Sequence, residues 1–102
     1  MAVSEESIVC NISRWLGRTP NCWHLKVHGG PFQRAGIPDI VGVICGVFFG
    51  MEVKNSVGQV SKIQEATMAR MEKAGCRTAV IRSLDEAKEF VSSLVPGLSG
   101  EE

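Results

Sequence analysis

The chain has 102 residues, of which 44% are hydrophobic and 22% charged, and this size predicts one compact domain without room for a second. Its 11 basic and 11 acidic side chains give a formal net charge of zero, which argues against a protein that simply coats phosphates. Residues 1–82 nevertheless carry ten Lys and Arg against six Asp and Glu, so either an ordinary solvated surface or a mildly basic body with an acidic end is expected.

The first third of the chain predicts a helix, a turn and a strand. Apolar residues between Ser4 and Leu16 recur at the spacing of an amphipathic helix, which Gly17 ends. Residues 19–21 predict a turn, and residues 22–28 alternate well enough for a strand. The glycine-rich stretch 29–36 predicts a loop.

Two strands follow, at residues 39–44 and 47–54, because both runs are rich in residues that favour strands. Only Cys45 and Gly46 separate them, which is the length of a tight hairpin turn. A loop of three residues would shift the register of the two strands. Residues 55–59 predict a polar loop.

The second half of the chain predicts a helix, a strand and another helix. Apolar residues are spaced for a helix from Val60 to Ala74, which Gly75 stops. Residues 77–82 predict a short strand. Residues 83–94 predict the last helix, with a serine at its N-cap and a Pro-Gly pair after it.

The predicted order is therefore α-β-β-β-α-β-α. A hairpin beside helices predicts an α/β or α+β sandwich with a mixed sheet. A nucleotide-binding fold made only of parallel strands is disfavoured, because the chain has no glycine-rich phosphate loop. We expect residues 1–96 to form the single domain and residues 97–102 to form a loose acidic tail.

The four cysteines, Cys10, Cys22, Cys45 and Cys76, contain no C-x-x-C pair that would indicate zinc binding or redox chemistry. Three of them lie in or beside apolar runs, so buried free thiols are expected. No apolar run approaches the roughly 20 residues of a membrane-spanning helix. The first residues also lack the pattern of a signal peptide. We therefore expect an intracellular, cytoplasmic protein.

Two carboxylates are expected to face each other across the hairpin. If Cys45 and Gly46 form the whole turn, Asp39 lies directly opposite Glu52, with Cβ atoms roughly 5 Å apart. Opposed carboxylates repel each other and destabilise a sheet. A divalent cation relieves the repulsion, since hard ions such as Mg²⁺ bind through one or two carboxylates and otherwise keep water. The pair is therefore a candidate metal site.

A lysine joins this pair on the same face. The alternation of a strand places Lys54 beside Glu52, while Met51 and Val53 point to the core. An ammonium group there can position an attacking water or stabilise charge on a phosphate oxygen. An isolated E-x-K is usually a solvated strand edge with an ion pair, and it is the coincidence with Asp39 that favours a catalytic site.

The first helix offers another acid. At about 100° per residue, Glu5 falls near the centre of the apolar stripe and Glu6 falls toward its edge. A carboxylate that points into the protein needs a partner, and a metal cluster is one. The alternative is that both glutamates simply complement the helix dipole.

Gln64 also has two explanations. Ser61-x-x-Gln64 is the pattern of a capping box, in which the glutamine side chain bonds back to the N-cap amide. Gln64 and Lys62 also follow the strand of Glu52 and Lys54 closely enough to border the same site. Both explanations remain open on the sequence alone.

Together these segments resemble a known family. Gly36-Ile37-Pro38-Asp39, then Met51-Glu52-Val53-Lys54, then Ser61-x-x-Gln64 are similar to the motifs of the PD-(D/E)XK nuclease superfamily. The closest resemblance is to its VRR-Nuc branch, whose small stand-alone versions are carried by phages. It covers residues 28–83, and the helix with Glu5 also fits. The E-x-K alone is unspecific, but its combination with G-I-P-D and the following glutamine is specific.

The resemblance implies the restriction-endonuclease-like αβββαβ core, with a mixed sheet flanked by helices. It implies a metal-dependent endonuclease that hydrolyses DNA phosphodiester bonds, with branched DNA such as Holliday junctions as the expected substrate. By the same analogy Asp39, Glu52 and the backbone carbonyl of Val53 bind Mg²⁺ or Mn²⁺. Lys54 then orients the hydrolytic water, and Gln64 supports the site.

The resemblance further implies that a glutamate of the first helix completes the acidic cluster. Glu5 is our choice for that role, with Glu6 as the alternative. Stand-alone members of the branch are similar to Holliday-junction resolvases in forming dimers, so a homodimer is expected. A phage-borne version would act inside the bacterial host.

Two other functional classes remain open. One is a non-catalytic module that recognises DNA structure, which binds branched or duplex DNA in a salt-dependent way without turnover. The other is a nuclease of the same superfamily that acts on other DNA or on RNA. A shared fold cannot decide between them, because related folds host different functions.

Overall fold

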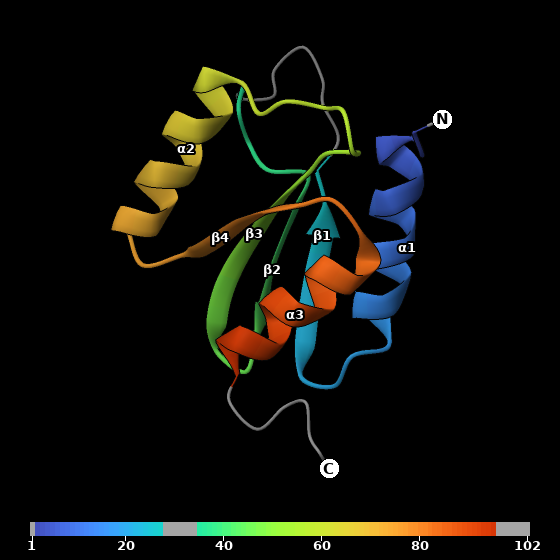
Figure 1. Cartoon of the computed structure of the whole chain (residues 1–102). Helices are drawn as coiled ribbons and strands as arrows, with labels where there is room; N and C mark the ends of the chain where they lie inside the picture. The colour runs from blue at the N-terminus through green and yellow to red at the C-terminus, as the bar shows by residue number, and fades with distance from the viewer. Residues whose placement is uncertain (1, 28–34, 96–102) are drawn as a thin grey trace.

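The computed structural model describes residues 2–27 and 35–95, and these form seven elements in the predicted order (Figure 1). They are α1 (Glu5–Gly17), β1 (Cys22–Lys26), β2 (Ile40–Ile44), β3 (Val47–Val53), α2 (Lys62–Lys73), β4 (Arg77–Ile81) and α3 (Leu84–Leu94). No helix among them has the length and apolar composition needed to cross a lipid bilayer. The predicted tail at 97–102 lies outside the described residues.

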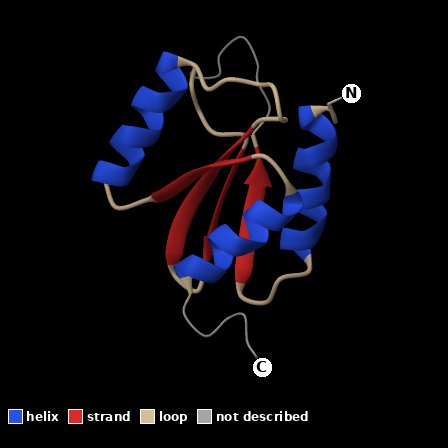
Figure 2. Ribbon diagram, in the orientation of Figure 1, coloured by secondary structure: helices blue, strands red, loops and turns tan. Residues whose placement is uncertain are grey.

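The four strands form one mixed sheet in the order β1-β2-β3-β4. β2 pairs antiparallel with both β1 and β3, whereas β4 runs parallel to β3. α1 and α3 lie on one side of this sheet and α2 lies on the other (Figure 2). The predicted α+β class with a mixed sheet and flanking helices is therefore confirmed.

The turn between β2 and β3 consists of two residues, as predicted. Cys45 has a φ of 48° and Gly46 a φ of 84°, which is the combination of a type I′ turn. The twist of this turn matches the right-handed twist of paired strands. Ile44 consequently pairs with Val47, and the register of the whole hairpin is set from that end.

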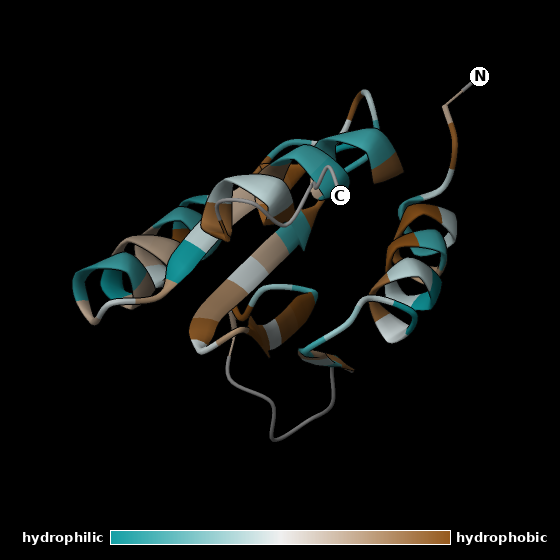
Figure 3. Ribbon diagram, turned by 90° about the horizontal axis from the view of Figure 1, so that it is seen from below, coloured by the Kyte–Doolittle hydropathy of each residue, from teal (hydrophilic) through white to brown (hydrophobic). Residues whose placement is uncertain are grey.

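The hydrophobic core lies between the sheet and the layer of α1 and α3. Phe49, Met51 and Val53 alternate along β3 and are at most 1% exposed. Phe90 of α3 packs edge-on against Phe49, with ring centroids 6.4 Å apart and an angle of 84° between the rings. In Figure 3 apolar and polar stretches alternate along the helices, as amphipathic packing requires.

Some element ends differ from the prediction for local reasons. Ser61 has an extended backbone and its hydroxyl caps α2, so this helix begins after it and not at Val60. β2 begins at Ile40, one residue after the predicted Asp39. β1 ends at Lys26, and the predicted last residue of that strand, His28, lies outside the described part of the chain.

The cysteines are less buried than the sequence predicts. All four are free thiols, but only Cys76 is buried, while Cys10 and Cys22 are half-buried. Cys45 is exposed, because it occupies the projecting turn of the hairpin. For Cys45 the expectation of a buried thiol is wrong.

The strained position of Cys45 gives a stability prediction. Replacing Cys45 with Asn creates Asn-Gly, the pair that type I′ turns favour, and should raise the free energy of unfolding by about 0.5–1 kcal/mol. Urea denaturation measures this change. Cys45→Ala is the matched control, because it removes the thiol without favouring positive φ; an equal gain from alanine would contradict the explanation.

Candidate active site

Asp39 and Glu52 come together at the open end of the hairpin. Ile40 pairs with Met51, so the next residue outward on each strand is one of the two acids. The Oδ2 atom of Asp39 accepts a hydrogen bond of 2.7 Å from the backbone N–H of Val53. The structure therefore brings the two predicted acids together, with the Asp39 carboxyl held over the strand that carries Glu52.

Glu52 is buried although it can carry a charge. It is 1% exposed, and it is the one polar or charged residue in the buried class among residues 2–27 and 35–95. Its pKa is raised to about 7, chiefly by burial and next by the Asp39 charge, while the Lys54 ammonium opposes this rise. Its Oε1 atom has no hydrogen-bond partner in the described structure, so an acceptor oxygen is left available.

The other carboxylate oxygen of Glu52 is held from two sides. Lys54 places its Nζ atom 3.5 Å from Glu52 Oε2, with 13% of the lysine side chain exposed. The Nε2 atom of Gln64 donates a hydrogen bond of 2.9 Å to the same oxygen. Both contacts fall on Oε2, which fixes the orientation of the carboxyl group and leaves Oε1 free.

Gln64 fulfils both of the explanations that the sequence left open. The side-chain Oε1 atom of Gln64 accepts a hydrogen bond of 2.9 Å from the backbone N–H of Ser61. The backbone N–H of Gln64 donates to the Ser61 hydroxyl at 3.2 Å. This is the predicted capping box at the start of α2. The same side chain therefore connects the first turn of α2 to Glu52. Lys62 is exposed at the first position of the helix.

Glu5 reaches the end of β3 from the first turn of α1. Its Oε2 atom accepts a hydrogen bond of 3.3 Å from the N–H of Asn55. Glu6 lies in the same turn and is exposed. Within the described ranges, no three His, Cys, Asp or Glu side chains are grouped so that they could hold a metal ion. The carboxyl pair of Asp39 and Glu52 forms the centre of the candidate site, and Glu5 lies against the turn that follows it.

That turn, at residues 55–58, is more ordered than the polar loop that the sequence predicts. Asn55 Oδ1 accepts hydrogen bonds from the N–H groups of Val57 at 3.1 Å and Gly58 at 2.8 Å. The Nη1 atom of Arg82 donates to the carbonyl oxygens of Asn55 and Gly58. An asparagine followed three residues later by glycine is the available sequence signal for such a turn. Nothing in the sequence pattern indicates the contact with Arg82.

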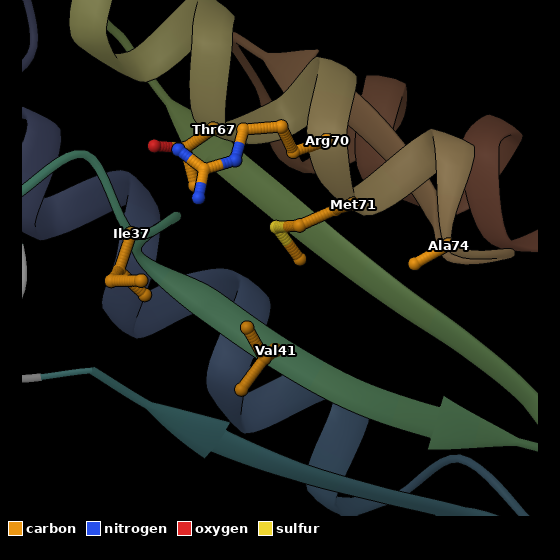
Figure 4. A pocket seen from close by; sticks show the side chains of 6 residues that line it. All are labelled: Ile37, Val41, Thr67, Arg70, Met71 and Ala74. Carbon is orange, nitrogen blue, oxygen red and sulfur yellow. The ribbon is translucent and has the colours of Figure 1, made fainter.

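An open hollow of about 350 Å³ lies between α2 and β2 (Figure 4). Figure 4 shows the Arg70 side chain extending along α2 beside Thr67. None of the predicted catalytic side chains lines this hollow. Its lining residues are Ile37, Val41, Thr67, Arg70, Met71 and Ala74.

The buried carboxyl of Glu52 predicts a pH dependence of stability in EDTA. Because its pKa is about 7 in the folded chain and about 4.5 unfolded, folding favours the proton. The stabilisation is complete below about pH 4.5 and is lost as pH rises through 7, a change of about 3 kcal/mol.

Urea denaturation at a series of pH values tests this dependence. Glu52→Gln lacks the titrating group, so wild type should lose stability relative to this variant between about pH 4 and pH 8. Parallel curves for the two proteins would show that Glu52 titrates normally. Groups that do not interact with Glu52 contribute equally to both curves and cancel in the difference, whereas its coupling to Asp39 and Lys54 is part of the measured effect.

Comparison with known proteins identifies the fold. No family model matches the chain, and no curated protein sequence matches it. Among solved structures, a VRR_NUC domain matches with a TM-score of 0.73 and 18% identity over 89% of this chain and 97% of its own. A VRR_NUC domain protein matches with the same TM-score and 14% identity, over 92% of this chain and 89% of its own. The chain therefore has the fold of the VRR_NUC domain, in agreement with the resemblance of its motifs.

Proposed function

We propose that this protein is a metal-dependent endonuclease of the VRR-Nuc family that hydrolyses DNA phosphodiester bonds. The observation that carries the proposal is the buried Glu52 carboxyl, which has a free oxygen and lies beside Asp39 and Lys54. The fold shared with two VRR_NUC structures supports the reaction class. Branched DNA such as a Holliday junction is the proposed substrate. We propose that the protein cleaves it inside the cell.

The acidic pair fits a hard divalent cation such as Mg²⁺ or Mn²⁺, because such ions prefer oxygen ligands. Glu52 Oε1 is buried without a partner, and positive charge would relieve its repulsion from Asp39. In our proposal these two carboxyls and the Val53 carbonyl would hold the ion. Glu5, with Glu6 as the alternative, would complete the set only after its carboxylate turns toward them, because Glu5 accepts a hydrogen bond from the Asn55 N–H in the structure. When bound, such an ion would neutralise charge at the scissile phosphate and lower the pKa of the attacking water.

Lys54 and Gln64 have separate tasks in this proposal. The Lys54 ammonium orients the attacking water by a hydrogen bond and stabilises negative charge that develops on the phosphate oxygens. Gln64 donates to Glu52 Oε2 and so keeps the carboxyl turned with Oε1 available. Both tasks depend on groups that are already in place around Glu52, and such preorganised groups need no rearrangement during the reaction.

Cleavage of a four-way DNA junction, a flap and a linear duplex with Mg²⁺ and Mn²⁺ tests the function. Lys54→Ala should lower the rate by about 10²–10³-fold while folding and DNA binding remain nearly intact. Glu52→Ala or addition of EDTA should abolish cutting. An RNA duplex measures the preference for DNA.

Three results would change the proposal. A folded Lys54→Ala protein that cuts at the wild-type rate would contradict the role of the lysine. Tight junction binding by wild type without any cutting would instead support the non-catalytic DNA-binding module. Faster cutting of RNA than of any DNA would support the alternative that the protein is a nuclease of the same superfamily that acts on RNA.

We also propose that the protein forms a homodimer through the outer face of β1. This strand is at the edge of the sheet, and Trp23 and Leu25 are 61% and 51% exposed. Strand pairing aligns Trp23 with Val43, and Val43 with Phe48, which is also exposed. An exposed apolar surface beside an unpaired strand edge is typical of an interaction site.

A second copy of this chain fits that edge because the strand is complementary to itself. If two copies of β1 pair antiparallel about His24, Trp23 of one copy lies opposite Leu25 of the other. Lys26 then lies opposite Cys22, so the two lysines do not repel each other. Apolar cross-strand pairs of this kind stabilise antiparallel strands.

Light scattering after size exclusion tests the dimer. Wild type should have twice the 11.0 kDa mass of one chain, and Leu25→Lys should shift the protein to the monomer. Val3→Lys adds the same charge at another exposed apolar residue and should leave the dimer intact. A wild-type monomer at every concentration, or a dimer that tolerates Leu25→Lys, would contradict this interface.

A further inference from the structure

Arg82 has no role in the proposed reaction, yet it is bonded to the turn next to Lys54. It follows β4 directly, and its side chain is half-buried. Its Nη1 atom donates hydrogen bonds of 2.6 Å to the carbonyl oxygen of Asn55 and 2.9 Å to that of Gly58. A single guanidinium nitrogen therefore holds both ends of the turn at residues 55–58.

The same turn lies against the Lys54 side chain. A Cβ atom added at Gly58 would lie 3.4 Å from Cδ of Lys54 and would collide with the carboxylate of Glu5. The backbone N–H of Lys54 donates to the Ile81 carbonyl oxygen at 3.0 Å, so the residue is also fixed from β4. The backbone of Lys54 is thus fixed, while its side chain can still rotate. Gly58 limits the positions that this side chain can take.

We propose that Arg82 is a positioning residue, which clamps residues 55–58 against the Lys54 side chain and so holds the ammonium group beside Glu52. A guanidinium suits this role, because its N–H groups lie in one plane and make strong charge-assisted bonds to carbonyl oxygens. Without it, the hydrogen bonds that this turn receives from elsewhere in residues 2–27 and 35–95 reduce to the one between Asn55 and Glu5. The kinetic consequence rests on the proposed nuclease function.

The test replaces Arg82 with Met, which keeps the stem and removes the guanidinium. Since a misplacement of about 1 Å lowers rates by roughly 100-fold, we expect kcat to fall about 10- to 100-fold while KM for the DNA junction changes less than about threefold. Arg82→Lys restores a donor and should give an intermediate kcat. Arg77→Met is the matched control, because it removes the same charge from an exposed arginine at the other end of β4.

Lost stability is separated from positioning by the conditions of the measurement. All variants are compared at a temperature where circular dichroism shows them folded. Wild-type kcat in folded Arg82→Met would overturn the proposal, as would an equal loss in the Arg77→Met control.

An activity-independent readout keeps this inference distinct from the nuclease proposal. In wild type, residues 54 and 58 lie close enough that a nuclear Overhauser effect is expected between the Gly58 Hα and Lys54 Hδ protons. It should disappear in Arg82→Met and persist in Arg77→Met. If wild type cuts no DNA, the nuclease proposal fails and this spectrum alone decides; an effect that survives Arg82→Met overturns the positioning role.

Discussion

Two carboxyl groups that face each other across a hairpin impose the main electrostatic cost of this structure. The two-residue turn sets a register in which Asp39 and Glu52 share one face of the sheet. Burial and the neighbouring acid both favour the protonated form of Glu52. Lys54 and Gln64 offset this cost by contacting one carboxylate oxygen of Glu52, Oε2, and not the other. The polar arrangement around the end of β3 follows from that imbalance.

The sheet keeps this polar arrangement apart from the hydrophobic core. Alternate residues of β3 point toward α1 and α3, where the packing is apolar and dense. The residues between them face the side of α2, where a buried charge can reach a helix cap and a lysine. Because the acidic pair and the hydrophobic core lie on opposite faces of the sheet, the repulsion between the two carboxyls need not disturb the packing that keeps the domain folded.

The sequence was most informative where short-range rules apply. The order of elements and the pairing of Asp39 with Glu52 follow from alternation and from a two-residue turn, and the Gln64 cap follows from its spacing to Ser61. Alternation does not say which side of a sheet a helix covers. The exposure of the Trp23 side chain could therefore not be predicted from the sequence. The bonds from Arg82 to the turn after β3 span more than 20 positions in the chain and depend on how β4 lies beside β3.

The double bonding of Gln64 narrows what this position accepts. Helix starts of this kind use glutamate as readily as glutamine, since either side chain can accept a hydrogen bond from the N-cap amide. Here the other end of the amide donates to Glu52. A glutamate would keep the cap but lose the donor, and it would bring a third negative charge to a pair that already repels. The chemistry of the neighbouring carboxyl thus turns an interchangeable capping residue into one that must be an amide.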